Sequence, residues 1–110
     1  MSKNALPSLT HLQYLVLGVL RSNDQPGRVL RRALADYGAR RSAPAFYQLM
    51  ARLEKAKLVE GWYEQITVHD QAVTERRYRI TPEGLRLWRN AQAFYEDVAR
   101  VSAKVRWSDA

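Results

Sequence analysis

The segment from Pro82 to Val105 constrains the fold most, because it has the pattern of one long helix with an apolar seam. The seam residues recur at alternating steps of four and three, and they are Leu87, Ala91, Phe94, Val98, Val101 and Val105. Leu85, Trp88 and Tyr95 widen the seam. A domain of 110 residues is too small to cover a helix of this length. We therefore expect its distal part to pair with a second copy of the chain, with packing against its own domain as the alternative.

Three shorter helical patterns precede this segment. Thr10 and Gln13 have the spacing of a capping box, and apolar residues surround the helix that follows. The second pattern ends at Gly38, and its apolar residues are Leu30, Ala33, Leu34 and Tyr37. The third begins at the expected N-cap Ser42, and its apolar residues are Phe46, Leu49, Met50 and Leu53. Two short helices joined by a glycine-containing turn fit a helix-turn-helix, although many helical hairpins have the same pattern.

After Leu58 and Val59 the pattern changes from helical to β. Residues 62–68 and 74–81 predict two strands, with a hairpin loop at residues 69–73, and residues 22–27 predict another loop. In the second strand Tyr78 and Ile80 share one face, while Arg77 and Arg79 lie on the other. We expect the first face to pack and the second to be cationic. The fold class is thus mainly α with a small β-wing, a winged helix-turn-helix followed by a long C-terminal dimerisation helix.

Composition narrows the class of protein. The net charge of +7 and the pI near 10.1 favour an anionic partner, either a nucleic acid or a membrane surface. There is no cysteine, and the apolar run at residues 12–20 is too short to span a bilayer. The two histidines, His11 and His69, belong to no nucleophilic or metal-binding motif. We expect a single cytoplasmic domain that is no enzyme and has no catalytic residue, metal or cofactor.

Three motifs together resemble the PadR family of transcriptional regulators. They are Phe46-Tyr47-x-Leu49-Met50-x-Arg52-Leu53-Glu54, then Leu58-Val59 with Trp62, and Arg76-Arg77-Tyr78-Arg79-Ile80-Thr81-Pro82-Glu83-Gly84. The single C-terminal helix is similar to the compact branch of that family. The sequence departs from the family at Lys57, where glycine is common, and at Asp70, in a wing loop without glycine.

The resemblance implies a homodimer that reads a pseudo-palindromic operator in double-stranded DNA, usually as a repressor and sometimes released by a small aromatic molecule. Residues 1–81 would form the DNA-binding region and residues 82–110 the dimerisation helix, within one compact domain. The alternative is a winged-helix module that binds proteins and not DNA.

The predicted DNA-binding residues lie at the start of the third helix and on the second strand. They are Arg40, Arg41, Ser42, Ala43, Tyr47, Gln48, Arg77 and Arg79. Gln48 has the chemistry to read adenine, and Tyr47 either donates to a phosphate or packs in the core. The position of Arg76 stays open, and we interpret Arg28, Arg31 and Arg32 as a solvated helix face that touches phosphate at its edge.

Three aromatic residues of the last helix are candidates for an effector pocket. They are Trp88, Phe94 and Tyr95, and the resemblance permits a planar ligand among them at the dimer interface. Simple packing is the alternative, because aromatic residues at helical spacing usually form part of a core.

Overall fold

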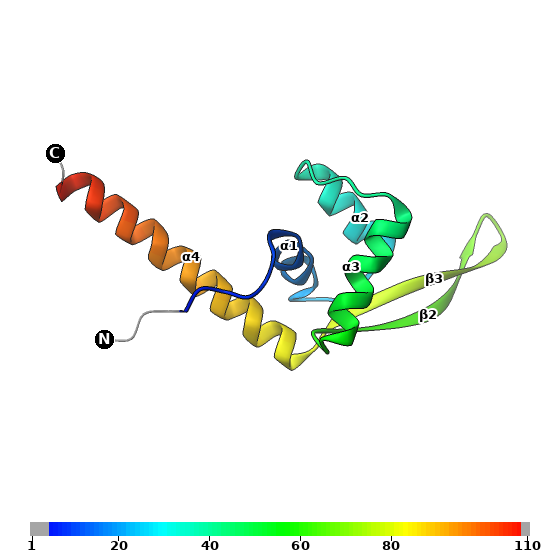
Figure 1. The fold of residues 1–110 in the computed structure, drawn as a ribbon. Helices are drawn as coiled ribbons and strands as arrows, with labels where there is room; N and C mark the ends of the chain where they lie inside the picture. The colour runs from blue at the N-terminus through cyan, green and yellow to red at the C-terminus, as the bar shows by residue number, and fades with distance from the viewer. Residues whose placement is uncertain (1–4, 109–110) are drawn as a thin grey trace.

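The computed structural model of this protein describes residues 5–108, with side chains for residues 5–101. Within that range the elements follow the order α1 (His11–Leu20), β1 (Gln25–Pro26), α2 (Gly27–Asp36), α3 (Ala43–Lys55), β2 (Val59–Val68), β3 (Gln71–Ile80) and α4 (Pro82–Ser108) (Figure 1). This arrangement confirms the predicted winged helix-turn-helix with a long C-terminal helix. None of the helices in the described residues is both long and apolar enough to cross a membrane.

Local sequence signals start three of the helices as predicted. At α1 the Gln13 amide donates to Thr10 Oγ1 at 3.1 Å, and the Thr10 amide donates to Gln13 Oε1 at 3.0 Å. At α3 the Ala45 amide donates to the Ser42 hydroxyl. Thr81 caps α4 in the same way, and its own hydroxyl donates to the Lys57 carbonyl at 2.8 Å. The cap of α4 therefore also ties this helix to the end of α3.

The core lies where α1, α2 and α3 meet the base of the sheet. Its buried residues include all the predicted apolar positions of α2 and α3 except Tyr37, Ala33 and Leu49. The largest is Tyr78 of β3, which is 1% exposed and meets the ring of Phe46 edge-on at 6.5 Å. Tyr37 is 77% exposed, so its prediction as an apolar position was wrong, because α2 ends at Asp36 and Tyr37 caps it.

The sheet differs from the prediction at both loops. Residues 22–27 do not form a loop throughout, because Gln25 and Pro26 pair with Tyr78 and Arg77 as the short strand β1. The sheet order is β1-β3-β2, with β3 in the middle. The hairpin loop contains only His69 and Asp70, both with positive φ, whereas the sequence predicted five residues.

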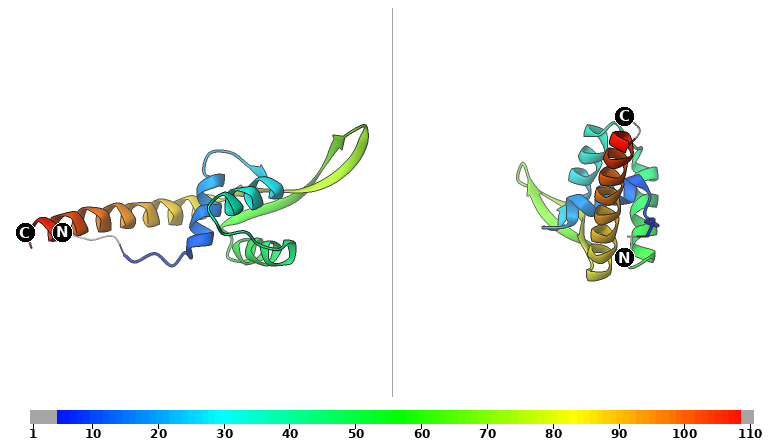
Figure 2. Two further views of the ribbon diagram at one scale, coloured as in Figure 1. Left: turned by 90° about the horizontal axis from the view of Figure 1, so that it is seen from above. Right: turned by 90° about the vertical axis from the view of Figure 1, so that its left-hand side faces the viewer.

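The wing and α4 project in opposite directions from the helical core (Figures 1 and 2), which gives the molecule extents of 64 × 27 × 22 Å. Lys57 lies at the junction of α3 and β2 with a φ of 62°. Glycine adopts this left-handed conformation most easily, which accounts for the glycine expected at this position. The departure at Lys57 therefore changes the residue and keeps the turn.

Candidate nucleic-acid interface

The N-terminal half of α3 presents its predicted reading residues to solvent. Gln48 is exposed, Ala43 is half-buried, and the Ser42 hydroxyl is used as the helix cap. Tyr47 is 50% exposed and contacts Phe46 edge-on at 5.4 Å, so it is not a core residue. Its phenol ring rests on the core, and this part of α3 is open to an approaching partner.

Arg40 and Arg41 precede this helix and are both exposed. The Arg41 guanidinium donates to the Arg40 carbonyl at 3.0 Å, which keeps that side chain close to the start of α3. The unpaired amides at a helix N-terminus attract anions, and two nearby cations strengthen that attraction.

The outer face of the wing is not the cationic surface that the sequence predicted. Arg77 is only 23% exposed at its side chain and forms ion pairs with three carboxylates, those of Asp24 at 2.6 Å, Glu64 at 3.1 Å and Glu75 at 3.5 Å. The hydrogen bond with Asp24 outweighs partial burial and raises the pKa of Arg77. The correction arises because acidic side chains from β2, from β3 itself and from the residue before β1 gather on this face.

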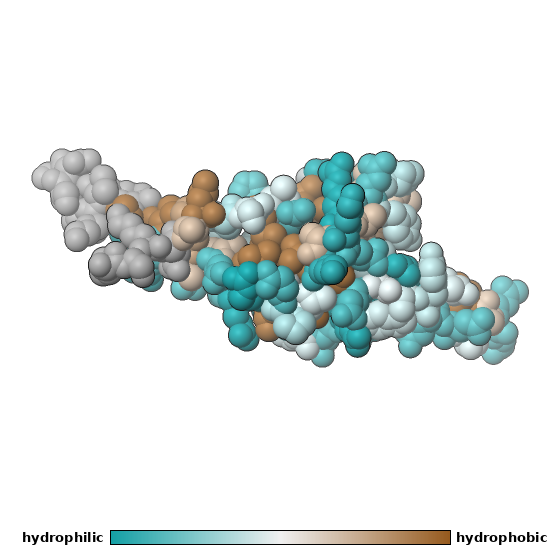
Figure 3. All heavy atoms as spheres, turned by 60° about the horizontal axis from the view of Figure 1, so that its bottom comes forward, coloured by the Kyte–Doolittle hydropathy of each residue, from teal (hydrophilic) through white to brown (hydrophobic). Residues whose placement is uncertain are grey.

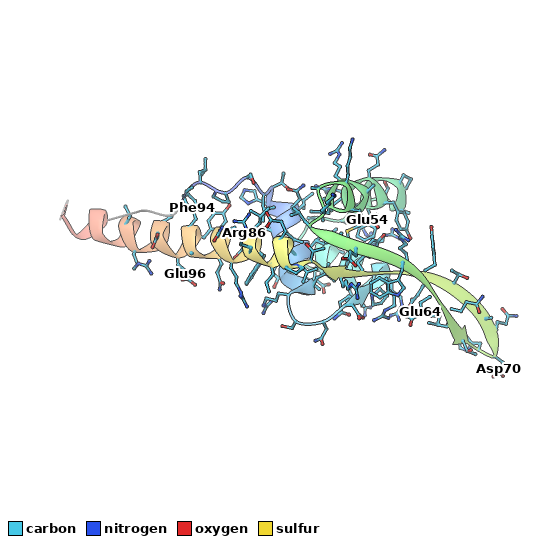
Figure 4. All side chains as sticks on the ribbon, turned by 90° about the horizontal axis from the view of Figure 1, so that it is seen from below. Glu54, Glu64, Asp70, Arg86, Phe94 and Glu96 are labelled. Atoms are coloured by element: carbon cyan, nitrogen blue, oxygen red, sulfur yellow. The ribbon has the colours of Figure 1, made fainter. Side chains whose placement is uncertain are left out.

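Arg79 is neutralised in a similar way at the base of the wing. Its Nε and Nη2 atoms donate to Glu60 Oε2 at 3.0 and 2.7 Å, and its guanidinium lies 5.6 Å from the Trp62 ring. Figure 4 shows Glu64 on the side of the sheet away from α3, and Asp70 at the tip of the wing. The strand register, which sequence reasoning did not predict, decides these ion pairs.

Arg76, whose position the sequence left open, joins α3 to the wing. Its Nη2 donates to Glu54 Oε1 at 2.6 Å, and its guanidinium lies 4.7 Å from the Tyr63 ring and 5.6 Å from the Tyr78 ring. Burial disfavours the charged form of Arg76, but Glu54 and Tyr78 outweigh burial and raise its pKa. Burial also raises the pKa of Tyr78, although Arg76 partly offsets it. We call Glu54, Arg76, Tyr63 and Tyr78 the wing clamp.

A groove of about 710 Å³ runs between α3 and the wing beside this clamp. Tyr47 lines it from α3, Arg28 lines it from α2, and Tyr63 lines it from β2. Figure 4 shows Glu54 on the α3 side of the sheet, where it borders the groove. The sequence alone could have indicated that Arg76 points inward, because it alternates with Tyr78 and Ile80 along the strand and alternate side chains share one face.

The three predicted effector residues belong to an aromatic cluster between α1 and α4. Tyr14 of α1 stacks on Trp88 at 5.6 Å and meets Tyr95 edge-on at 5.5 Å, and Phe94 contacts Tyr95 at 5.3 Å. Burial, together with Glu96, raises the pKa of Tyr14. Trp88 Nε1 is buried without a hydrogen-bond partner among the described residues. Sequence reasoning missed Tyr14, although the all-round apolar pattern of α1 indicated that this helix is covered on several sides.

The apolar seam of α4 divides into an inner and an outer half. Leu87 packs against the core and Ala91 is fully buried within the chain. Phe94 is half-buried, whereas Val98 and Val101 are 43% and 51% exposed. In Figure 3 apolar atoms lie exposed along α4, between the body of the molecule and its far end. Val105, the last predicted seam residue, has a side chain outside the described residues.

The wing clamp supports a prediction about stability. Replacing Glu54 with Gln leaves Arg76 half-buried without its charge partner and should lower the free energy of unfolding by about 1–3 kcal/mol. Gly61 lies against the ion pair, and a Cβ there would overlap the Glu54 carboxylate and lie 2.8 Å from Arg76 Nη2. Gly61→Ala should therefore cost a similar amount, and the double variant should cost less than the sum.

Urea unfolding followed by circular dichroism measures these changes. Glu60→Gln is the matched control, because it removes the exposed ion pair with Arg79 and should cost less than about 1 kcal/mol. Strict additivity of Glu54→Gln and Gly61→Ala would contradict the clamp.

Comparison with solved structures identifies several PadR-family transcriptional regulators among the relatives of this chain. A PadR family transcriptional regulator from Eggerthella lenta DSM 2243 is 33% identical, with 86% of this chain and 80% of that chain covered and a TM-score of 0.62. A PadR-like transcriptional regulator from Bacillus cereus strain ATCC 14579 is 25% identical, with coverages of 86% and 87% and a TM-score of 0.62.

A PadR family transcription regulator from Clostridium difficile R20291 shares the fold at a TM-score of 0.73 and 14% identity, with coverages of 87% and 98%. No protein-family model and no curated protein matches the chain. The first relative exceeds 30% identity over most of both chains, and it is of the same family that the motifs on α3 and β3 indicated. The chain therefore belongs to the PadR family, and it is a transcriptional regulator and not an enzyme.

Proposed function

We propose that this regulator binds double-stranded DNA as a homodimer and represses transcription from a pseudo-palindromic operator. Residues 1–81 form the DNA-binding region and residues 82–110 the dimerisation helix. The observation that carries the proposal is the exposed N-terminal half of α3, which two exposed arginines precede. A recognition helix with these properties enters the major groove with its first turns toward the bases.

On α3, Gln48 is the proposed base reader, because its amide forms two hydrogen bonds with adenine in the major groove. The Tyr47 hydroxyl and the Ser42 and Ala43 backbone lie near enough to the start of the helix to position it on phosphates. Arg40 and Arg41 would bind phosphates beside them. In this arrangement Gln48 would recognise the DNA sequence, and the phosphate contacts would hold the helix in position.

Arg77 and Arg79 remain in the proposed interface, but each would have to exchange a carboxylate for a phosphate. Arg77 would leave up to three carboxylates, and Arg79 would leave Glu60. Because these exchanges replace one charge-assisted contact with another, we expect them to contribute less affinity than Arg40 and Arg41.

The outer half of the α4 seam is the proposed dimer interface. Val98 and Val101 are exposed on one side of a helix that extends beyond its own domain. Their heptad spacing suits a second copy of the same helix, and Phe94 and Val105 continue the seam on either side. A two-fold pair of winged helices would then match the symmetry of a pseudo-palindromic operator.

The aromatic cluster is the proposed effector site. A planar aromatic molecule would stack against Trp88, Phe94 and Tyr95 near the dimer interface. Because α1 and α4 both contribute to the cluster, such a ligand would change how the dimer presents its two α3 helices. Through that change the effector would relieve repression.

DNA binding is tested by fluorescence anisotropy with fragments selected from the native genome. Arg41→Ala should weaken binding to every sequence by roughly fivefold, because it removes a phosphate contact. Gln48→Ala should instead alter the preference among operators. Arg89→Ala, on the exposed part of α4, is the control. The proposal would be refuted if selected fragments bind no better than scrambled DNA and their affinity does not change with salt. Capture of a protein partner would then favour the alternative, a winged-helix module that binds proteins.

Dimerisation is tested by sedimentation velocity at micromolar concentration. The double variant Val98→Glu/Val101→Glu should be monomeric, because it places two like charges on the seam of each copy. Arg89→Glu changes the net charge by the same amount on the opposite side of α4 and should remain dimeric. A monomeric unmodified protein would exclude the interface and the operator symmetry that depends on it.

Effector binding is tested with Trp88 as the remaining fluorophore, in a Trp62→Phe/Trp107→Phe background. Planar aromatic compounds should quench Trp88 emission saturably and release labelled operator over the same concentration range. The variant Tyr95→Ala should weaken both effects together. Emission that no compound changes would count against the pocket and leave the cluster as packing alone.

A further inference from the structure

A second concave surface lies between α2 and the segment that connects it to α3. This hollow has a volume of about 340 Å³, and five of its lining residues are arginines, namely Arg28, Arg31, Arg32, Arg40 and Arg41. Asp36 is the one acidic side chain among the described residues that line it. We call this surface the arginine hollow.

The charge of the hollow is largely uncompensated. Of its five arginines, Arg28 forms an ion pair with Glu75 at 3.2 Å. The other four take part in none of the ion pairs found within the described part of the chain. This contrasts with Arg77 and Arg79 on the wing, which are both neutralised. The excess positive charge of the DNA-binding region therefore lies beside α2 and not on the wing.

The fold brings these like charges together. Arg28, Arg31 and Arg32 lie at steps of three and four on α2, on one side of the helix, because Leu30 and Leu34 face the core. Gly38, with a φ of 79°, ends the helix and turns the chain toward Arg40 and Arg41. Neighbouring cations repel one another, so a bound anion would lower the free energy of this arrangement.

The arginine hollow adjoins the exposed surface of α3 on two sides. Arg28 also lines the groove between α3 and the wing, together with Tyr47. Arg41 also lines a neighbouring hollow of about 300 Å³ that contains Gln48 and Arg52. Figure 1 shows the connecting segment leading to the start of α3 on the side from which the wing projects. A single ligand can thus contact α3 and the arginine hollow together.

We propose that the arginine hollow binds phosphates of the DNA backbone next to the half-site that α3 reads, and that Arg31 and Arg32, which the sequence placed on a solvated face at the edge of the interface, bind phosphate directly. This inference rests on the proposed function. Guanidinium groups bind phosphate oxygens through paired hydrogen bonds and remain charged at every physiological pH. The hollow makes the α2 side, and not the wing, the main electrostatic contact with DNA. A free phosphate anion has the same chemistry, and the test below distinguishes it.

The test compares Arg31→Gln/Arg32→Gln with Arg86→Gln/Arg89→Gln, which removes the same charge from α4. Anisotropy titrations over a salt series with operator and scrambled DNA measure affinity and its salt dependence. The first variant should bind both DNAs roughly tenfold or more weakly at about 0.15 M salt, and the slope of log affinity against log salt should be shallower by roughly 2. The control should retain the slope of the unmodified protein. Circular dichroism confirms that both variants fold.

Three outcomes separate the explanations. An unchanged slope for Arg31→Gln/Arg32→Gln, with a loss for Arg40→Gln/Arg41→Gln, would overturn the arginine hollow and leave the proposed function intact. Absence of DNA binding by the unmodified protein would instead refute the proposed function itself. Calorimetry with inorganic triphosphate tests whether the hollow is instead a site for a free anion. Stoichiometric binding that Arg31→Gln/Arg32→Gln abolishes, without any change in DNA affinity, would identify a free-anion site and overturn the DNA assignment.

Discussion

The ion pair between Glu54 and Arg76 is the interaction on which the geometry of the winged helix-turn-helix depends. It joins the last turn of α3 to the middle strand of the sheet, between the rings of Tyr63 and Tyr78. Tyr78 is buried in the core, so the clamp ties the wing to the same core that holds α3. The clamp therefore sets the separation between α3 and the wing.

The distribution of charge follows from the same sheet. Because β3 lies between β1 and β2, its outward arginines meet carboxylates on both sides, among them Asp24, which directly precedes β1, and Glu60 of β2. The helices α2 and α3 have few acidic residues near their exposed arginines. The net charge of +7 is thus unevenly distributed, and the helix-turn-helix has more uncompensated charge than the wing. A DNA-binding protein built this way would attach chiefly through its helices.

Because α4 is long, it takes part in both dimerisation and effector binding as proposed above. Its inner half completes the core through Leu87 and Ala91, and its outer half presents Val98 and Val101. The aromatic cluster lies between these halves and also includes Tyr14 of α1. A ligand at that position would contact the folded domain of one copy and, in the proposed dimer, the interface with the second copy.

The sequence by itself determined the helices, their caps and the face of β3 that packs, because hydrogen bonds at Thr10, Ser42 and Thr81 and the spacing of apolar residues are local properties. It also identified the family through the motifs on α3 and β3. Only the tertiary structure decided that β1 pairs with β3, that Glu54 holds Arg76, and that the arginines of α2 share a hollow with Arg40 and Arg41. These contacts join residues far apart in the chain or depend on strand register, which periodicity does not encode.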